Sequence, residues 1–361
     1  MSPTGRSRAD LSSARKILIL RLRRVGDVVM TLPAVELLKS FLPDASLTYL
    51  IEEPYRRLVE GHPFVDQVLS VPEKQDRRGF FSFLRRVRRE RFDVLLDFHG
   101  GPRASWITAF SGAACKVGYA IRSKGFLYDI RVPRRPEEGT LHSVQTHAAL
   151  VRALGFDFND GAIPPLRLPN ATPDEKLRLD AMMGEFGLAG GRFVVLHIGA
   201  GNAFRDWGAD NHAETARRLI RRTGFPIALI GGSADLTRQA EVIAGAVASP
   251  DGIAPDRIIG LAGRLNLIET KELIARAGLF IGPDSGPMHI AASTPTPIVA
   301  VFGPTLPAHF APWRTGQRTV ILQREMDCRP CKQRECLTHD FRCLKSITPA
   351  DVESSCLPFL N

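Results

Sequence analysis

The sequence predicts an α/β protein of two halves, each built around a parallel sheet. Segments typical of strands alternate with segments typical of helices in both halves. Several strands are near-continuous apolar runs, which suit a parallel sheet covered on both faces. The chain has 361 residues, a length that suits two domains better than one. We expect domains at 1–168 and 169–343, and a tail at 344–361 that packs back toward the N-terminal domain.

The first half opens with an expected strand at 16–22, a glycine-containing loop and a helix at 28–39. This order places ligands at the carboxyl ends of strands. Further strands are expected at 47–51, within 62–69 and from 92, with helices at 79–91 and 141–154. The helix at 79–91 is amphipathic and rich in arginine. It either packs on the sheet with a solvated basic face or docks on an anionic lipid surface.

The second half repeats the alternation after a linker at 156–173, which is rich in Pro, Asp and Asn. Its expected strands cover 192–198, 226–230, a segment ending at 281, and 296–302. Its expected helices cover 174–186, 212–223, a segment after 233, 266–277 and the residues from 287.

Composition limits the class of protein. Hydrophobic content of 44% and charged content of 24% are those of an ordinary globular protein, and no stretch is apolar for long enough to span a bilayer. The first residues do not resemble a secretory signal, so we expect a cytoplasmic protein. The net charge of +10 indicates an anionic partner: nucleic acid, an anionic membrane surface or a phosphorylated substrate.

One stretch carries a specific signal: Gly282-Pro-Asp-Ser-Gly-Pro-Met-His289. A strand that breaks here and re-enters a helix leaves free backbone N–H groups, which can receive a diphosphate. Asp284 and Ser285 can cap the helix or bind a ligand hydroxyl, and Gly286 lets a bulky group approach the backbone. His289 lies about one turn further along. The alternative is a capped strand–helix turn with a structural histidine.

Three glycine-rich strand ends, at 199–207, 231–235 and 282–289, should open on one edge of the second sheet and form a nucleotide site. There Arg205 can neutralise a diphosphate and Asp235 can accept from a ribose hydroxyl. The candidate donor contacts are Gly199, Arg205, Gly232, Asp235, Asp284, Ser285, Gly286 and His289.

Several catalytic motifs are absent from the sequence. The loop at 199–204 has Phe where a dinucleotide fingerprint needs its third glycine. We find no Walker P-loop, no Gly-x-Ser-x-Gly elbow and no His-Glu-x-x-His zinc motif.

The candidate general base is Asp27, at the carboxyl end of the first expected strand. Because Arg23 and Arg24 lie beside it, the carboxylate should stay ionised at neutral pH. It can then take a proton from an incoming hydroxyl, an effect typically of about 10²–10⁴ in rate. The alternative is that Asp27 caps the following helix.

These residues resemble the heptosyltransferases of glycosyltransferase family 9, which extend the inner core of lipopolysaccharide. The resemblance rests on motifs that run from about residue 16 to about residue 352: Arg24-Val-Gly-Asp-Val-Val-Met-Thr-Leu-Pro-Ala34, Leu196-His-Ile-Gly-Ala200, Arg205-Asp-Trp207, Leu261-Ala-Gly-Arg-Leu-Asn-Leu267, Gly282-Pro-Asp-Ser-Gly-Pro-Met-His-Ile-Ala-Ala292, Gly303-Pro-Thr305 and Ile347-Thr-Pro-Ala-Asp-Val352.

The resemblance implies a GT-B fold, two Rossmann-like domains facing across a cleft, with the acceptor on the N-terminal half and the nucleotide-sugar on the C-terminal half. It implies inverting, metal-independent transfer of heptose from ADP-heptose. Asp27 then becomes the base, and Arg205 takes the place of a diphosphate-binding lysine. Two departures leave the acceptor and the donor sugar open: Arg23 and Arg24 stand where some members have serines, and the 199–204 loop is not threonine-rich.

The resemblance also accounts for the positive charge. The implied acceptor is an anionic lipid A–Kdo core at the cytoplasmic face of the inner membrane, so we expect peripheral association there and no nucleic-acid partner. Five basic residues are candidate acceptor contacts, although each suits a solvated surface charge as well: Arg56, Arg57, Arg103, Arg122 and Lys124.

Four cysteines form a separate pattern, C-x₂-C-x₄-C-x₆-C, made by Cys328, Cys331, Cys336 and Cys343. In a cytosolic chain this spacing favours a structural zinc or an iron–sulfur cluster over disulfides. Free thiols or partial disulfides are the alternative.

Two other functions remain open at this stage. One is a different nucleotide-sugar enzyme on the same fold, a hexosyltransferase or an epimerase. The other is a non-catalytic module that binds a nucleotide or a nucleic acid through its basic face.

Overall fold

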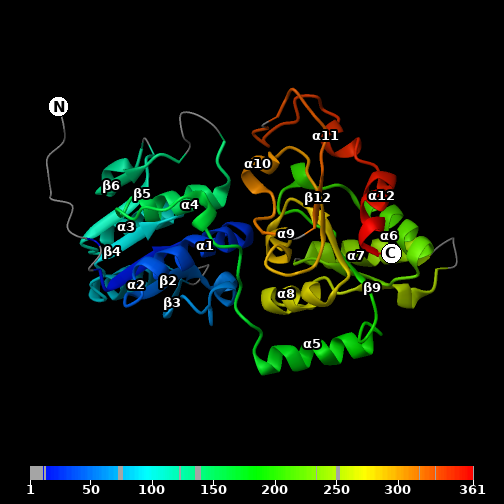
Figure 1. The fold of residues 1–361 in the computed structure, drawn as a ribbon, viewed down its shortest axis with the longest axis horizontal. Helices are drawn as coiled ribbons and strands as arrows, with labels where there is room; N and C mark the ends of the chain where they lie inside the picture. The colour runs from blue at the N-terminus through cyan, green and yellow to red at the C-terminus, as the bar shows by residue number, and fades with distance from the viewer. Residues whose placement is uncertain are drawn as a thin grey trace. The chain divides into compact units, whose positions relative to one another are not determined.

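The structure is a computed structural model that describes residues 11, 14–71, 76–121, 123–134, 140–232, 234–248, 253–316, 318–329 and 331–360. The chain divides into two compact units, Met1–Pro169 and Asn170–Asn361. Each unit holds one six-stranded sheet in which all strands are parallel (Figure 1). The predicted α/β class with parallel sheets is confirmed.

The first unit has the strand order β3-β2-β1-β4-β5-β6. Its strands are β1 (Lys16–Leu20), β2 (Ser46–Glu52), β3 (Gln67–Val71), β4 (Val94–Asp97), β5 (Cys115–Tyr119) and β6 (Ile130–Val132). Its helices are α1 (Val25–Phe41), α2 (Arg77–Arg89), α3 (Pro102–Phe110) and α4 (Ser143–Arg152), with single 3₁₀ turns η2 (Glu53–Leu58), η3 (Gly125–Leu127) and η4 (Asp160–Ala162).

Helices cover both faces of this sheet. Helix α1 packs against α4, and α2 packs against α3. On the α2–α3 side, Leu18 and Leu20 of β1 form one core cluster with Phe83 of α2 and Ile107 of α3. Burial on both faces is the physical reason why the β1 residues form an unbroken apolar run.

The second unit has the strand order β12-β11-β10-β7-β8-β9. Its strands are β7 (Val194–His197), β8 (Ile227–Ile230), β9 (Ile258–Gly260), β10 (Leu279–Pro283), β11 (Ile298–Val301) and β12 (Thr319–Leu322). Its helices are α5 (Pro173–Glu185), α6 (Ala209–Thr223), α7 (Ala234–Ala248), α8 (Leu267–Arg276), α9 (Gly286–Ala291), α10 (Pro307–Phe310), α11 (Arg342–Lys345) and α12 (Pro349–Leu360), with 3₁₀ turns η5 (Ala203–Arg205) and η6 (Pro255–Arg257).

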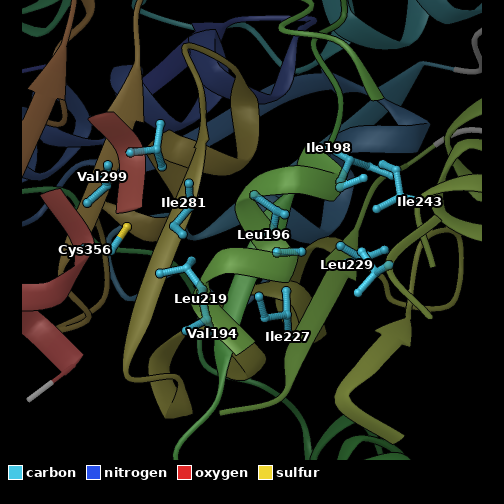
Figure 2. Packing of buried hydrophobic residues seen from close by; sticks show 14 of the residues in the cluster. Val194, Leu196, Ile198, Leu219, Ile227, Leu229, Ile243, Ile281, Val299 and Cys356 are labelled. Carbon is cyan, nitrogen blue, oxygen red and sulfur yellow. The ribbon is translucent and has the colours of Figure 1, made fainter. Parts of the chain in front are cut away.

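The C-terminal segment corrects one expectation. Residues 344–361 were expected to pack toward the N-terminal domain, but the contact division assigns them to the second unit. Helix α12 packs against α6, and its Cys356 lies in one core cluster with Leu219 of α6 and Val299 of β11 (Figure 2). The indole Nε1 of buried Trp207 donates to the carbonyl of Ile347 at 2.9 Å, which fixes the start of this segment.

The two sheets have the same strand order when each is numbered from its own first strand, the order of a Rossmann fold. In the first unit, the strands that follow β1 in the chain extend toward one edge of the sheet, and those that follow β4 extend toward the other edge. Strands β7 and β10 divide the second sheet in the same way. The carboxyl ends of these pairs are the positions where open α/β sheets bind ligands. Among the described helices, none is both long and apolar enough to cross a bilayer.

Candidate active site

The polar site of the first unit is an ion pair between Arg21 and Asp27. Arg21 follows β1 and is 4% exposed, while Asp27 lies in the first turn of α1. The Arg21 Nη2 is 2.6 Å from Oδ1 of Asp27, whose side chain is 44% exposed. The Arg21 Nη1 also donates to the carbonyl of Phe98, just after β4. Arg21 therefore ties the carboxyl end of β4 to a carboxylate that remains accessible.

Electrostatics keep this carboxylate ionised. Burial of the site opposes ionisation of Asp27, but the Arg21 guanidinium and the backbone amide of Arg24 outweigh it and hold the pKa of the carboxyl below its ordinary value. The amide of Arg24 donates to Oδ2 of Asp27 at 3.3 Å. The capping alternative is thus partly right, because the side chain does satisfy an amide at the helix start. The same side chain keeps an exposed edge.

A second carboxylate, Asp97, ends β4 but is fully used inside the fold. Its Oδ1 accepts from the amides of His99 and Gly100, each at 2.8 Å. Its Oδ2 accepts from the hydroxyls of Tyr128 at 2.7 Å and Thr108 at 3.2 Å. Asp97 is 0% exposed, so of the two carboxylates only Asp27 can reach a substrate.

A pocket opens beside this site, at the carboxyl ends of β1 and β2. Its floor holds the buried carboxylate of Glu52, which pairs with Arg103 at 3.0 Å and with Arg23 at 3.9 Å. Its lining residues are Arg23, Glu52, Asp76, Arg77, Phe80, Pro102, Arg103 and Trp106. Three arginines against two carboxylates leave one excess positive charge, which suits an anionic ligand.

Of the four candidate acceptor residues that the structure describes, Arg103 alone lines this pocket. Arg56 pairs with Glu60 at 2.8 Å, and Nη1 of Arg57 donates to the carbonyl of Glu60. Lys124 donates to the carbonyl of Gly100 at 3.3 Å. Arg122 lies outside the described residues. Sequence reasoning missed Arg77 and Trp106, which come from α2 and α3, because no local motif marks them.

In the second unit, Arg205 lies between two chain segments. Its Nη1 is 3.2 Å from Oδ2 of Asp284, and its Nε donates to Oε1 of Gln333 at 2.9 Å. Asn202, three residues earlier, donates to the same Gln333 oxygen at 3.0 Å. Gln333 thus holds the Arg205 loop from a segment 128 residues further along the chain, a role that no sequence pattern indicates.

Asp284 is 2% exposed, and its side chain faces Arg205. Burial raises the pKa of this carboxyl, while the Arg205 guanidinium opposes the rise. Next to it, the Ser285 hydroxyl lies 3.3 Å from Nδ1 of His197, the last residue of β7. Burial lowers the pKa of His197 to about 3, so this imidazole is neutral near pH 7. The pair joins the ends of β7 and β10.

The remaining predicted donor residues have varied surroundings. A Cβ at Gly199 would lie 2.4 Å from the Leu236 side chain, so a larger residue here would displace this leucine of α7. Gly232 is exposed, and Gly286 begins α9, which is only six residues long. His289 is 3% exposed. Asp235 lies in α7, but its side chain is outside the described residues.

The four cysteines line one small cavity together with Phe204, Phe341 and other residues. Each has a free thiol. Hydrogen bonding from Thr338 lowers the pKa of Cys336, whereas burial raises the pKa of Cys343. Within the described ranges, no three His, Cys, Asp or Glu side chains are placed to hold one metal ion.

Two Rossmann-like units, each with charged side chains at its ligand-binding strand ends, define the GT-B class of glycosyltransferase. Comparison with known proteins supports this class. The chain is similar to a glycosyltransferase family 9 structure from Veillonella parvula, with a TM-score of 0.80 and 23% identity over 98% of this chain and 99% of that one. It is similar to the Escherichia coli ADP-heptose lps heptosyltransferase II, with a TM-score of 0.77 and 22% identity over 96% and 98%.

The sequence comparisons give the family. Residues 80–341 match the profile of glycosyltransferase family 9 (heptosyltransferase). The chain is also 24% identical to lipopolysaccharide heptosyltransferase 1 of Pseudomonas aeruginosa, over 89% of this chain and 87% of that protein. The chain therefore belongs to glycosyltransferase family 9, the heptosyltransferase family, and the resemblance stated from the motifs is confirmed.

Proposed function

We propose that this enzyme transfers a heptose from ADP-heptose to the inner core of lipopolysaccharide, with inversion at the anomeric carbon and with Asp27 as general base. The observation that carries the assignment of the base is the Arg21–Asp27 pair. It holds an ionised, 44% exposed carboxylate at the strand ends, whereas the neighbouring carboxylate of Asp97 accepts four hydrogen bonds inside the fold.

The chemistry follows from these groups. Asp27 takes the proton of an acceptor hydroxyl as the hydroxyl oxygen bonds to the anomeric carbon of the heptose. The bond from that carbon to the diphosphate breaks, and ADP leaves with the bonding electrons. A carboxylate of low pKa is a weak base. Its contribution to the rate therefore comes mainly from its position beside the acceptor hydroxyl, and from a transition state in which the bond to the leaving group is already largely broken.

The second unit supplies charge for the leaving group. We infer that Arg205 binds the diphosphate, supported by its partial exposure and by the fixing of its Nε on Gln333 and its Nη1 beside Asp284. Donors fixed before the reaction stabilise developing charge without reorganisation. Because α9 has only six residues, its N-terminus adds less than a long helix would. We further infer that Ser285 and Gly286 approach the donor, and that no metal is required.

For the acceptor, we infer that the pocket lined by Arg23, Arg77 and Arg103 takes an acidic sugar or a phosphate of the lipid A–Kdo core. Guanidinium groups bind carboxylate and phosphate bidentately, which suits both. Such an acceptor is anchored in a bilayer, so we propose peripheral association with the cytoplasmic face of the inner membrane. We propose that the enzyme does not act on nucleic acid.

We also propose that the four cysteines hold a structural zinc or an iron–sulfur cluster. The support is that all four line one cavity and are free thiols. Such a site would brace the segment that carries Gln333, while the thiols would have to close in on the ion. Metal analysis of protein purified without chelator tests this: about one equivalent of zinc, or stoichiometric iron and sulfide, supports it. Metal-free protein in which all six thiols of the unfolded chain titrate contradicts it.

The function is tested by incubating the enzyme with a lipid A–Kdo acceptor and a panel of ADP- and UDP-sugars, followed by mass spectrometry. We expect a gain of one heptosyl residue from ADP-heptose alone. A hexosyl gain would identify a hexosyltransferase, and an isomerised donor without acceptor would identify an epimerase. Donor binding with no turnover of any sugar would leave a binding module.

A further inference from the structure

Exposed aromatic side chains gather in one region of the first unit. Within the described ranges, the exposed Phe and Trp residues all belong to α2, α3 or η3: Phe81 at 49%, Trp106 at 54%, Phe110 at 41% and Phe126 at 76%. Helix α3 contacts both α2 and η3. The rings of Trp106 and Phe110 stack at 5.7 Å. The four rings therefore lie on neighbouring elements of the first unit.

The same region carries dense positive charge. Six exposed arginines lie on the 13 residues of α2: Arg77, Arg78, Arg85, Arg86, Arg88 and Arg89. As far as the chain is described, none of them forms an ion pair with an acidic side chain, and α2 itself contains no acid. We call these six arginines and the four aromatic residues the α2–α3 face.

The core cluster on this side of the sheet contains none of these side chains. The apolar stripe of α2, made by Phe83, Leu84 and Val87, is already buried in the core. Keeping six like charges on one helix costs stability through repulsion. A surface that exposes Trp and Phe beside arginine suits the headgroup region of an anionic bilayer. The rings enter the interface, and the arginines contact lipid phosphates.

The acceptor pocket borders this face. Arg77 of α2 and Trp106 of α3 belong both to the pocket lining and to the α2–α3 face. We propose that the α2–α3 face docks on an anionic lipid bilayer and brings the pocket mouth to the headgroups. The proposal rests on the proposed function for its membrane-anchored acceptor. Nucleic acid, the other polyanion that arginines and aromatic rings can bind, is an outcome of the test.

The test is co-sedimentation of the full chain with vesicles of phosphatidylcholine, with or without an equal part of phosphatidylglycerol. We expect binding to the anionic vesicles alone, weakened by salt. The triple variant Arg85→Gln/Arg86→Gln/Arg89→Gln should bind roughly a hundredfold more weakly, since each arginine contributes about fivefold. The double variant Phe81→Ser/Phe126→Ser should lose about tenfold or more. Neither variant alters a residue that lines the pocket.

Control variants remove the same charge, or one exposed apolar side chain, from the second unit. The variants Arg222→Gln/Arg238→Gln/Arg334→Gln and Leu177→Ser change exposed residues of the second unit and should bind vesicles like wild type. Equal losses in the control and test variants would overturn the proposal, as would binding to an RNA oligonucleotide in preference to anionic vesicles. Circular dichroism confirms that each variant is folded.

Activity separates this proposal from the proposed function. With an acyl-free, water-soluble acceptor, the α2–α3 variants should keep wild-type turnover, whereas with acceptor in vesicles they should lose it in proportion to binding. Vesicle binding without any heptosyl transfer would overturn the function and leave the docking surface intact. Heptosyl transfer by the wild-type enzyme without vesicle binding would overturn the docking surface and leave the proposed function intact.

Discussion

Replacing Arg21 by methionine should raise the pKa of Asp27 and move the acid limb of the pH–rate profile. The guanidinium lies 2.6 Å from the carboxylate and is the main group that lowers its pKa, while burial acts in the other direction. An opposite charge this close favours the ionised form of a carboxyl, so its removal should raise the pKa. Because the Asp27 side chain is 44% exposed, solvent screening weakens the effect without abolishing it.

The assay is kcat/KM for heptosyl transfer measured across acid pH, where a deprotonated base is needed for activity. In wild type the limb should lie below the ordinary Asp value of about 3.9, and in Arg21→Met it should move to higher pH. Arg21→Lys, which keeps a positive charge, serves as the control and should shift the limb less. An unchanged limb in a folded Arg21→Met enzyme would refute the pairing as the source of the lowered pKa.

Stability should follow the same pair. The pKa of Asp27 is lower in the folded than in the unfolded chain, so its contribution is present above the unfolded value and is lost as pH falls through the folded value. Arg21→Met removes this depression. Acid unfolding, followed by circular dichroism, should therefore begin at higher pH in the variant than in wild type.

Two further variants test the second unit. Gln333→Leu removes the oxygen that accepts from both Arg205 and Asn202, so the Kd for ADP, measured by calorimetry, should rise about threefold to tenfold with little change in Tm. The control variant Glu335→Gln should bind ADP like wild type. An unchanged Kd in Gln333→Leu would mean that Gln333 does not position Arg205. Trp207→Phe removes the buried hydrogen bond from the indole to the carbonyl of Ile347, so the free energy of unfolding, measured in urea, should fall by about 1–3 kcal/mol. A change near zero would contradict the role of Trp207 in anchoring the C-terminal segment.

Much of the fold could be predicted from the sequence because its signals are local. The apolar run of β1 and the Gly26-Asp27 pair lie close together in the chain, although this pair was expected before the helix and lies in the first turn of α1. Strand β5 was missed because Lys116 and Gly118 interrupt its apolar pattern. Strand β12 was missed although its Thr-Val-Ile-Leu run is typical of a strand. The tail was misplaced because its partner, the indole of Trp207, comes from 140 residues away.

The site was predictable to the same extent. The motifs indicated Asp27 and Arg205 directly, and the structure gives each a charged partner. The residues around them could not be predicted from local motifs. Gln333 reaches Arg205 from a distant segment, and Trp106 lines the pocket because α2 and α3 pack together. Local patterns predict which residues carry charge at strand ends, whereas tertiary packing decides which residues surround them.

The most direct test of the account is single-turnover transfer by Asp27→Asn at saturating ADP-heptose and acceptor, with ADP affinity measured in parallel. Asparagine keeps the shape of the side chain, and its one oxygen can still accept from Arg21 or from the Arg24 amide. The account predicts a rate lower by about 10²–10⁴ with unchanged ADP affinity. Turnover close to wild type in this variant would contradict it.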